Sequence, residues 1–189
     1  VVNFDKTIPV KRLAKKCNFT QQEIYGSVFE SEIERDFEKG LVSPERFFSY
    51  LNDKFHFQCS FNEFKDIFAD MFTLNERMAG LLFEIKKKNL VLCLLSNTDI
   101  IHFEFIRNKY KALDVFSHFV LSYAFKVMKP DPKIYTEAMK LCKAEPRECI
   151  YIDDTLEFAE AASILGMSGI HYNDTEQIKL ELIKSGVEV

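Results

Sequence analysis

The chain has 189 residues, 47% of them hydrophobic and 29% charged, with a formal net charge of -4 at pH 7. This mixture excludes a mainly disordered chain, and the length suits one domain with a sizeable core, or a core domain with a smaller one. The negative charge argues against nucleic-acid binding as the main function, because nucleic-acid-binding surfaces are usually basic.

Cysteine usage and hydropathy predict a cytoplasmic protein. The five cysteines are odd in number, scattered and without a CxxC pair, so we expect free thiols in a reducing compartment: Cys17, Cys59, Cys93, Cys142 and Cys149. No apolar stretch approaches the ~20 residues needed to cross a bilayer, and residues 1–10 show no signal-peptide pattern. We therefore expect a protein without membrane contact. The sequence leaves its oligomeric state open between a monomer and a homodimer.

The first part of the chain, before residue 76, predicts helices throughout. One helix is expected from Thr20, which stands in capping-box spacing with Glu23, as far as Gly40. A second is expected over residues 43–55, which open with a capping serine followed by proline.

A third helix, predicted over residues 60–72, repeats the capping-box spacing and is rich in aromatic rings. Its phenylalanines recur at helical spacing on one face: Phe61, Phe64, Phe68 and Phe72. Ten phenylalanines lie between Phe29 and Phe72, and rings of this size let a small bundle bury substantial area. We expect most of them in a bundle core, with one or two facing a pocket.

Short apolar runs alternate with helical patterns after residue 76. Four runs predict strands, at residues 90–95, 118–122, 149–152 and 168–172. Helices are expected at residues 131–142, opened by an Asp-Pro pair, and at residues 156–166, closed by glycine. This alternation predicts an α/β fold with a Rossmann-like parallel sheet flanked by helices. Ligands of such sheets bind beyond the carboxyl ends of the strands.

Polar residues follow the first two of these strands. Ser96 is the first polar residue after six apolar ones, and its hydroxyl together with the following N–H groups suits a phosphate. Serine is equally a favoured N-cap, so a structural role is the alternative. Lys129 stands before Pro130 in a loop stiffened by Pro-Asp-Pro and can present a fixed positive charge. Lys126 competes for that role, and an ordinary surface lysine is the alternative reading.

Two adjacent carboxylates, Asp153 and Asp154, close the run "CIYIDD". Like charges side by side repel each other, and a bound cation would offset that repulsion. One of the acids could cap the next helix, although Thr155 is equally suited and the other acid would then stay unexplained. Magnesium is held by one or two carboxylates together with waters and phosphate oxygens, which such a pair can supply.

These segments resemble motifs of the haloacid dehalogenase superfamily of aspartyl-nucleophile hydrolases, and most closely its small bacterial sugar-phosphate phosphatases. "LLSNTD" resembles the second motif, "KVMKPDPKIY" the third, and "YIDDT" followed by "EAASILGM" the fourth. The resemblance implies Lys129 and Ser96 as catalytic residues that, with Asn97, contact the substrate phosphate. It implies Asp154 as the preferred Mg2+ ligand, with Asp153 beside it.

The resemblance also implies a domain division, with a helical cap over residues 6–75 and an α/β core over residues 76–189. The segment "FEKGLVSPERFFSYL" is similar to the family's cap. The family's first motif, a strand ending in the nucleophilic aspartate, is matched only by its tail, "VVNFD" at residues 1–5. We therefore expect the nucleophile about five or six residues before Val1, at the end of a strand lying between those that end at Ser96 and Asp153. The sequence would then continue upstream, or another chain would supply this strand.

The predicted function is that of a Mg2+-dependent phosphatase, acting on a small phosphorylated metabolite through an aspartyl-phosphate intermediate. Without the nucleophile, the printed chain by itself is expected to be inactive. Three residues depart from the family's pattern near the predicted site: Lys126 and Met128, in place of Gly and Arg, and Phe158, in place of Asp or Asn. The alternative, favoured by Phe158 and the incomplete first motif, is a non-catalytic binding or interaction protein on the same fold. A carbon–halogen dehalogenase fits less well, because that chemistry has no phosphate charge or metal to accommodate.

Overall fold

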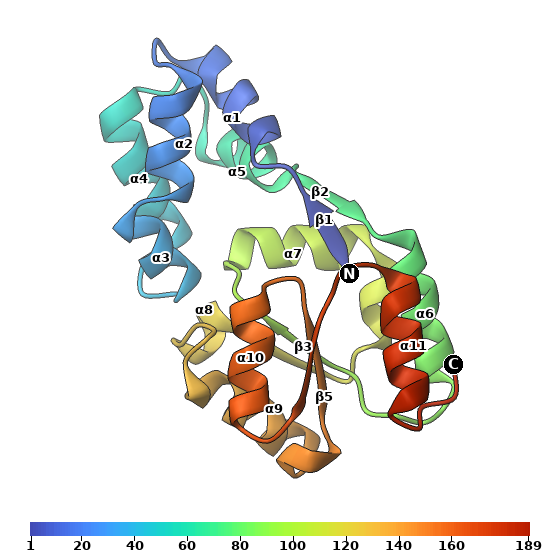
Figure 1. The fold of residues 1–189 in the computed structure, drawn as a ribbon. Coiled ribbons are helices and arrows are strands. Elements are labelled where there is room, and N and C mark those ends of the chain that lie inside the picture. Colours follow the sequence, from blue (N-terminus) through green and yellow to red (C-terminus); the bar gives the residue numbers. More distant parts are fainter.

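A computed structural model describes residues 1–189 and shows two lobes, one helical and one α/β (Figure 1). The lobes are joined by a two-stranded antiparallel ribbon of β1 (Val2–Phe4) and β2 (Phe72–Leu74). The boundary predicted between residues 75 and 76 falls between β2 and the first helix of the α/β lobe. None of the helices has the length and apolar character needed to cross a membrane.

The helical lobe has an aromatic core. Its elements are α1 (Thr7–Leu13), the short 3-10 helix η1 (Ala14–Lys16), α2 (Gln21–Phe29), α3 (Glu32–Glu38), α4 (Pro44–Phe55) and α5 (Phe61–Ala69). Phe37, Phe47, Phe64 and Phe68 are at most 1% exposed. Phe37 stacks on Phe47 with ring centroids 4.5 Å apart, and Phe64 stacks on Phe68 at 5.5 Å. Rings from three helices thus supply the bundle core that the phenylalanine pattern predicts.

Two helix predictions in this lobe need correction. The single helix expected from Thr20 to Gly40 is broken at Glu30, and α3 starts anew with Ser31 as its cap. The Ser31 hydroxyl accepts a bond from the backbone N–H of Glu34 at 3.3 Å, which replaces the helical bonds lost at the break. The helix expected to run to Phe72 ends at Ala69, because Phe72 enters β2 instead.

The α/β lobe alternates strands and helices as the sequence predicts. Its elements are α6 (Glu76–Lys86), β3 (Cys93–Ser96), α7 (Ile100–Lys109), η2 (Lys111–Val115), β4 (His118–Leu121), α8 (Ser122–Phe125), α9 (Pro132–Cys142), η3 (Pro146–Glu148), β5 (Ile150–Asp153), α10 (Leu156–Ile164), β6 (Ser168–His171) and α11 (Thr175–Lys184). Each of the four strands lies within or next to a predicted apolar run, displaced by three residues at most.

The strands form two parallel pairs, β3 with β4 and β5 with β6. The sequence predicts a single sheet, whereas no ladder joins β3 to β5 here. Helix α9 packs on β3 and β4, and α10 packs on β5 and β6. The carboxyl ends of β3 and β5 face the helical lobe (Figure 1), which brings Ser96 and Asp153 to one edge.

The tip of α3 touches the α/β lobe next to this edge. The Ser122 hydroxyl donates to the Glu38 carbonyl oxygen at 2.6 Å, and Lys126 Nζ donates to the Gly40 carbonyl oxygen. Gly40 has a positive φ of 63°, and a Cβ added there would clash with the carbonyl oxygen of Tyr123. Only glycine meets both requirements without strain, so this contact between the lobes depends on it.

Candidate active site

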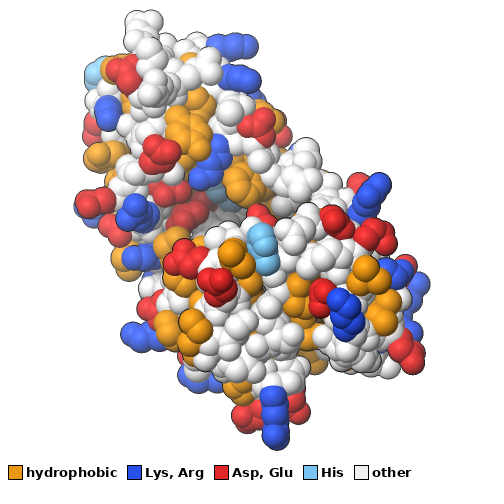
Figure 2. All heavy atoms as spheres, in the orientation of Figure 1, with side chains coloured by type: hydrophobic (Ala, Val, Ile, Leu, Met, Phe, Trp, Pro, Cys, Tyr) orange, Lys and Arg blue, Asp and Glu red, His pale blue; other side chains and the backbone are white.

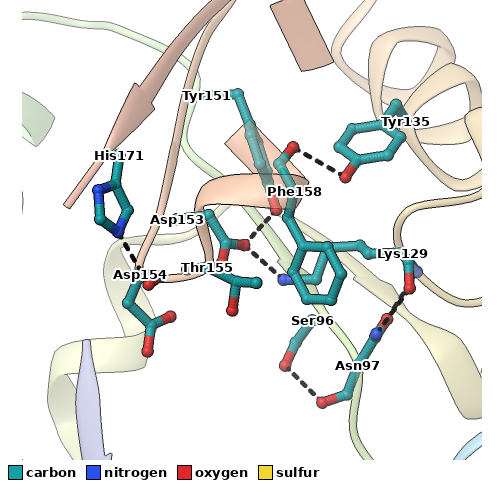
Figure 3. Close-up of polar contacts among 10 residues, drawn as sticks. All are labelled: Ser96, Asn97, Lys129, Tyr135, Tyr151, Asp153, Asp154, Thr155, Phe158 and His171. Carbon is teal, nitrogen blue, oxygen red and sulfur yellow. Dashed lines mark hydrogen bonds and ion pairs between the residues drawn. The ribbon is translucent and has the colours of Figure 1, made fainter. Parts of the chain in front are cut away.

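Lys129 and Asp153 form a buried ion pair at the centre of the predicted site (Figure 3). Lys129 Nζ lies 2.6 Å from Asp153 Oδ2, and the two side chains are only 9% and 6% exposed. Asp153 is the last residue of β5, and Lys129 lies in the loop between α8 and α9. A buried pair of this kind is held by precise geometry and by further hydrogen bonds to the carboxylate.

Asp153 receives two further hydrogen bonds. The Tyr151 hydroxyl donates to Oδ2 at 2.5 Å, and the backbone N–H of Thr155 donates to Oδ1 at 2.9 Å. Burial, followed by the charge of Asp153, raises the pKa of the Tyr151 hydroxyl. Tyr151 was missed by the sequence reasoning, although residues two apart on a strand share one face and the spacing in "YID" could have identified it.

Phe158 packs against the lysine of this pair. Lys129 Nζ lies 4.8 Å from the centre of the Phe158 ring, within the range of a cation–π contact. The Phe158 carbonyl oxygen accepts a bond from the Tyr135 hydroxyl at 3.0 Å, which fixes the start of α10 to α9. The residue that departs from the family's acidic pattern therefore supports Lys129 in this chain (Figure 3).

Ser96 and Asn97 lie at the end of β3, opposite the ion pair (Figure 3). The Ser96 hydroxyl makes one long contact, to the carbonyl oxygen of Asn97 at 3.3 Å. The cap of α7 is Asp99, so Ser96 does not serve as the N-cap that was its structural alternative. The Asn97 amide donates to the carbonyl oxygen of Lys129 at 3.1 Å and accepts from its N–H at 2.8 Å, so Asn97 positions the lysine loop.

The two candidate lysines have different partners in the structure. Lys129 lies at Asp153, whereas Lys126 is exposed and reaches the helical lobe at Gly40. Lys129 therefore lies with Asp153 at the strand ends, Lys126 serves the contact between the lobes, and phosphate binding by Lys129 stays a prediction.

Asp154 differs from its neighbour in every respect. It is exposed, its carboxylate makes no hydrogen bond or ion pair within the chain, and it points away from the Asp153 carboxylate (Figure 3). Its backbone carbonyl oxygen contacts His171 Nε2 at 3.2 Å, which fixes the turn after β5. The chain thus offers one engaged carboxylate and one available carboxylate at the same edge.

A comparison with known families tests the resemblance seen in these motifs. The sequence pattern described as a haloacid dehalogenase-like hydrolase matches residues 13–166. The chain belongs to this family of hydrolases. The resemblance seen in the motifs and the α/β fold class predicted from the strand pattern are therefore confirmed.

Individual haloacid dehalogenase-like relatives add detail. A sesquiterpene phosphatase from Aspergillus oryzae is 27% identical over 160 residues, which cover 83% of this chain and 81% of that protein. A family enzyme from Bacteroides thetaiotaomicron, solved with magnesium and inorganic phosphate, has a TM-score of 0.80 at 24% identity, covering 90% of this chain and 88% of that one. A predicted family hydrolase from Porphyromonas gingivalis has a TM-score of 0.79 at 19% identity, covering 100% and 93%. At these identities the two structures show the shared fold alone.

The side chains of this haloacid dehalogenase-like hydrolase suit a magnesium site that keeps several waters better than a metal site in which protein side chains supply every ligand. No group of three or more His, Cys, Asp or Glu side chains is placed to hold an ion. Magnesium needs only one or two carboxylates, because it keeps several of its waters. Asp154 fits such a site as a free, exposed carboxylate, whereas both oxygens of Asp153 already accept hydrogen bonds. Mg2+ binding by Asp154 and Asp153 stays a prediction.

Proposed function

We propose that this protein is a Mg2+-dependent phosphatase that hydrolyses the monoester of a small phosphorylated metabolite through an aspartyl-phosphate intermediate. The single observation that carries the proposal is the buried Lys129–Asp153 pair, 2.6 Å apart, near the Ser96 hydroxyl, whose one contact is long at 3.3 Å. A cation held rigidly beside a hydroxyl donor is what a phosphoryl group requires. The name of the Aspergillus oryzae relative supports the same reaction class.

In the proposed reaction the residues of this chain bind and orient the phosphate. The Ser96 hydroxyl donates to one phosphate oxygen, and Lys129 Nζ offsets charge on the others. Asp153, Tyr151 and Asn97 hold Lys129 in place. Magnesium, when bound at Asp154 with Asp153 beside it, would reduce the repulsion between an anionic nucleophile and the phosphate.

On the family resemblance, we assign the covalent step to the aspartate of the family's first motif, of which residues 1–5 match only the tail. Its carboxylate oxygen bonds to phosphorus while the ester oxygen leaves with the bond electrons and takes up a proton. Water then attacks the phosphoaspartate, releasing inorganic phosphate and restoring the carboxylate. The helical lobe, held at α8 by the Ser122 and Lys126 bonds, would exclude bulk water from this step.

The test replaces Asp154 with asparagine in the full-length protein and measures phosphate release from p-nitrophenyl phosphate over a range of Mg2+ concentrations. We expect turnover to fall at least ~100-fold at saturating substrate, because the free carboxylate is lost while the fold is kept. Asp53→Asn, at an exposed position on α4, is the control and should retain wild-type turnover. Equal turnover in Asp154→Asn would remove Asp154 from the site. A wild-type protein that binds phosphate esters without hydrolysing them would support the non-catalytic alternative.

A further inference from the structure

Two glutamates on α3, Glu34 and Glu38, have carboxyl groups without partners in the chain. They stand four residues apart and therefore share one face of the helix. Glu34 is only 8% exposed, and its carboxylate makes no hydrogen bond or ion pair. Glu38 is half-buried, and only its backbone carbonyl oxygen is engaged, by Ser122. The one fully buried side-chain oxygen or nitrogen without a partner is Asn52 Oδ1, so the carboxylate oxygens of Glu34 keep access to solvent and are open to a ligand.

Neighbouring charges do not supply the missing partner. Asp99, on the facing α7, is already satisfied, since His102 Nδ1 lies 2.5 Å from one carboxylate oxygen and the His102 N–H donates to the other at 3.0 Å. Lys6 lies near both glutamates, but its Nζ is 5.1 Å from the Phe29 ring centre and pairs with neither carboxylate. Burial, with the charge of Glu38 next, raises the pKa of Glu34 to about 8, and burial followed by the charge of Asp99 raises the pKa of Glu38. Neither acid therefore has a direct ion pair, although the charge of Lys6 acts on both and that of Lys129 acts on Glu38.

Glu38, at the end of α3, lies next to the loop that follows Ser96, and Glu34 lies one helical turn behind it. The Ser122 hydroxyl that bonds the Glu38 carbonyl oxygen also contacts Thr98, accepting from its N–H and approaching its carbonyl oxygen, both at 2.9 Å. Thr98 is two residues after Ser96, so one hydroxyl ties α3 to the loop that follows β3. The charge of Lys129 also acts on Glu38. Figure 2 shows acidic side chains gathered beside a hollow where the two lobes face each other.

This arrangement is unfavourable for a purely anionic ligand. A phosphate ester brought to Ser96 and Lys129 would favour the neutral, protonated form of both acids, and a neutral leaving group would leave both carboxyl groups without an ionic partner. A positive charge on the leaving group would remove the conflict, because it would pair with the glutamates while the phosphate pairs with Lys129. A purely apolar leaving group, as in a prenyl phosphate, would leave the buried Glu34 without a partner.

We propose that Glu34 and Glu38 bind an ammonium group on the leaving group, so that the substrate is the phosphate monoester of a small amino alcohol or amino sugar. This inference rests on the proposed phosphatase function and specifies its substrate class. The glutamates select the substrate, whereas Ser96 and Lys129 hold the part of the molecule that reacts.

The experiment compares pairs of phosphate esters in which an amino group on the leaving group is replaced by a hydroxyl group. Values of kcat/KM are measured for 2-aminoethyl against 2-hydroxyethyl phosphate, and for glucosamine 6-phosphate against glucose 6-phosphate, with farnesyl phosphate as an apolar reference. In the wild-type protein we expect the amine to be preferred by ~10-fold or more in at least one pair, and both amines over farnesyl phosphate. Glu34→Gln and Glu38→Gln should each lower the amine-to-hydroxyl ratio, whereas Glu32→Gln, exposed on the same helix, should leave it unchanged.

Calorimetric binding of the same esters, at a pH where the amines are charged, separates this inference from the phosphatase proposal. Hydrolysis without an amine preference, or a ratio that Glu34→Gln and Glu38→Gln leave unchanged, would overturn the inference and leave the phosphatase proposal intact. The opposite result is a protein that releases no phosphate but binds the amine esters more tightly, with the preference lost in both variants. That result would support the inference and overturn the phosphatase proposal.

Discussion

The most direct physical test concerns Glu34, whose carboxyl group is buried without a partner on α3. Burial raises the pKa of Glu34 from 4.5 to about 8. At one pKa unit per 1.36 kcal/mol, a shift of this size corresponds to about 5 kcal/mol between its charged and neutral forms. With a raised pKa the folded state binds more protons than the unfolded chain, so this group lowers the free energy of unfolding as the pH rises from about 4.5 towards about 8.

Replacement of Glu34 by glutamine removes this loss of stability. We expect Glu34→Gln to be nearly as stable as wild type at pH 5 and more stable at pH 8, by about 3–5 kcal/mol. The assay is urea unfolding followed by circular dichroism at pH 5, 6.5 and 8, at one ionic strength because Glu38, Asp99, Lys6 and Arg35 also act on this carboxyl. Glu32→Gln, exposed on the same helix, is the matched control. If the difference in unfolding free energy between wild type and Glu34→Gln stays constant from pH 5 to pH 8, the carboxyl is not buried as described and this reasoning fails.

Two further predictions concern the ion pair and the contact between the lobes. Lys129→Met leaves the Asp153 carboxylate buried without its cation and should cost about 3–5 kcal/mol in urea unfolding, with phosphatase turnover lower by several orders of magnitude. Lys133→Met, at an exposed position on α9, is the control for turnover, and an equal loss of turnover in both variants would show that Lys129 has no specific role. Gly40→Ala forces a side chain onto a positive φ and against Tyr123, and should cost about 1–3 kcal/mol of stability. Gly80→Ala, in α6 with no atom within 4 Å of the added carbon, should not destabilise, and a Gly40→Ala protein as stable as this control would contradict the described contact.

Local patterns predicted most of the fold because the decisive interactions are local. Thr20, Ser43 and Ser60 cap the helices that the sequence assigns to them, and each hydroxyl accepts from an N–H three residues ahead. The break at Glu30 was missed because the apolar pattern continues through it and Ser31 reads as an ordinary polar residue in a helix. A helix interruption of this kind is set by packing between helices, which periodicity does not record.

The sequence predicted only those site residues that the order of strands and helices brings to one edge of the α/β lobe. Ser96 and Asp153 end β3 and β5, Lys129 lies in the loop between α8 and α9, beyond β4, and parallel strands bring their carboxyl ends to one edge. The choice of Asp153 rather than Asp154 as the partner of Lys129 depends on which way each side chain turns. Glu34 and Glu38 on α3 could not be predicted as site residues, because the sequence does not show which face of the helical lobe packs on the α/β lobe.

The adjacency of Asp153 and Asp154 has a simple geometric basis. Successive residues at a strand end point to opposite sides, so neighbours in sequence need not be neighbours in space. Asp153 turns inward to Lys129 and Tyr151, and Asp154 turns outward to solvent (Figure 3). Lys129 therefore compensates the charge of Asp153, and Asp154 is the acid at this edge that has no ion pair. The same division accounts for Phe158: with Lys129 already paired to Asp153, an aromatic ring against the lysine stem and ammonium stabilises the pair where a third acid would add charge.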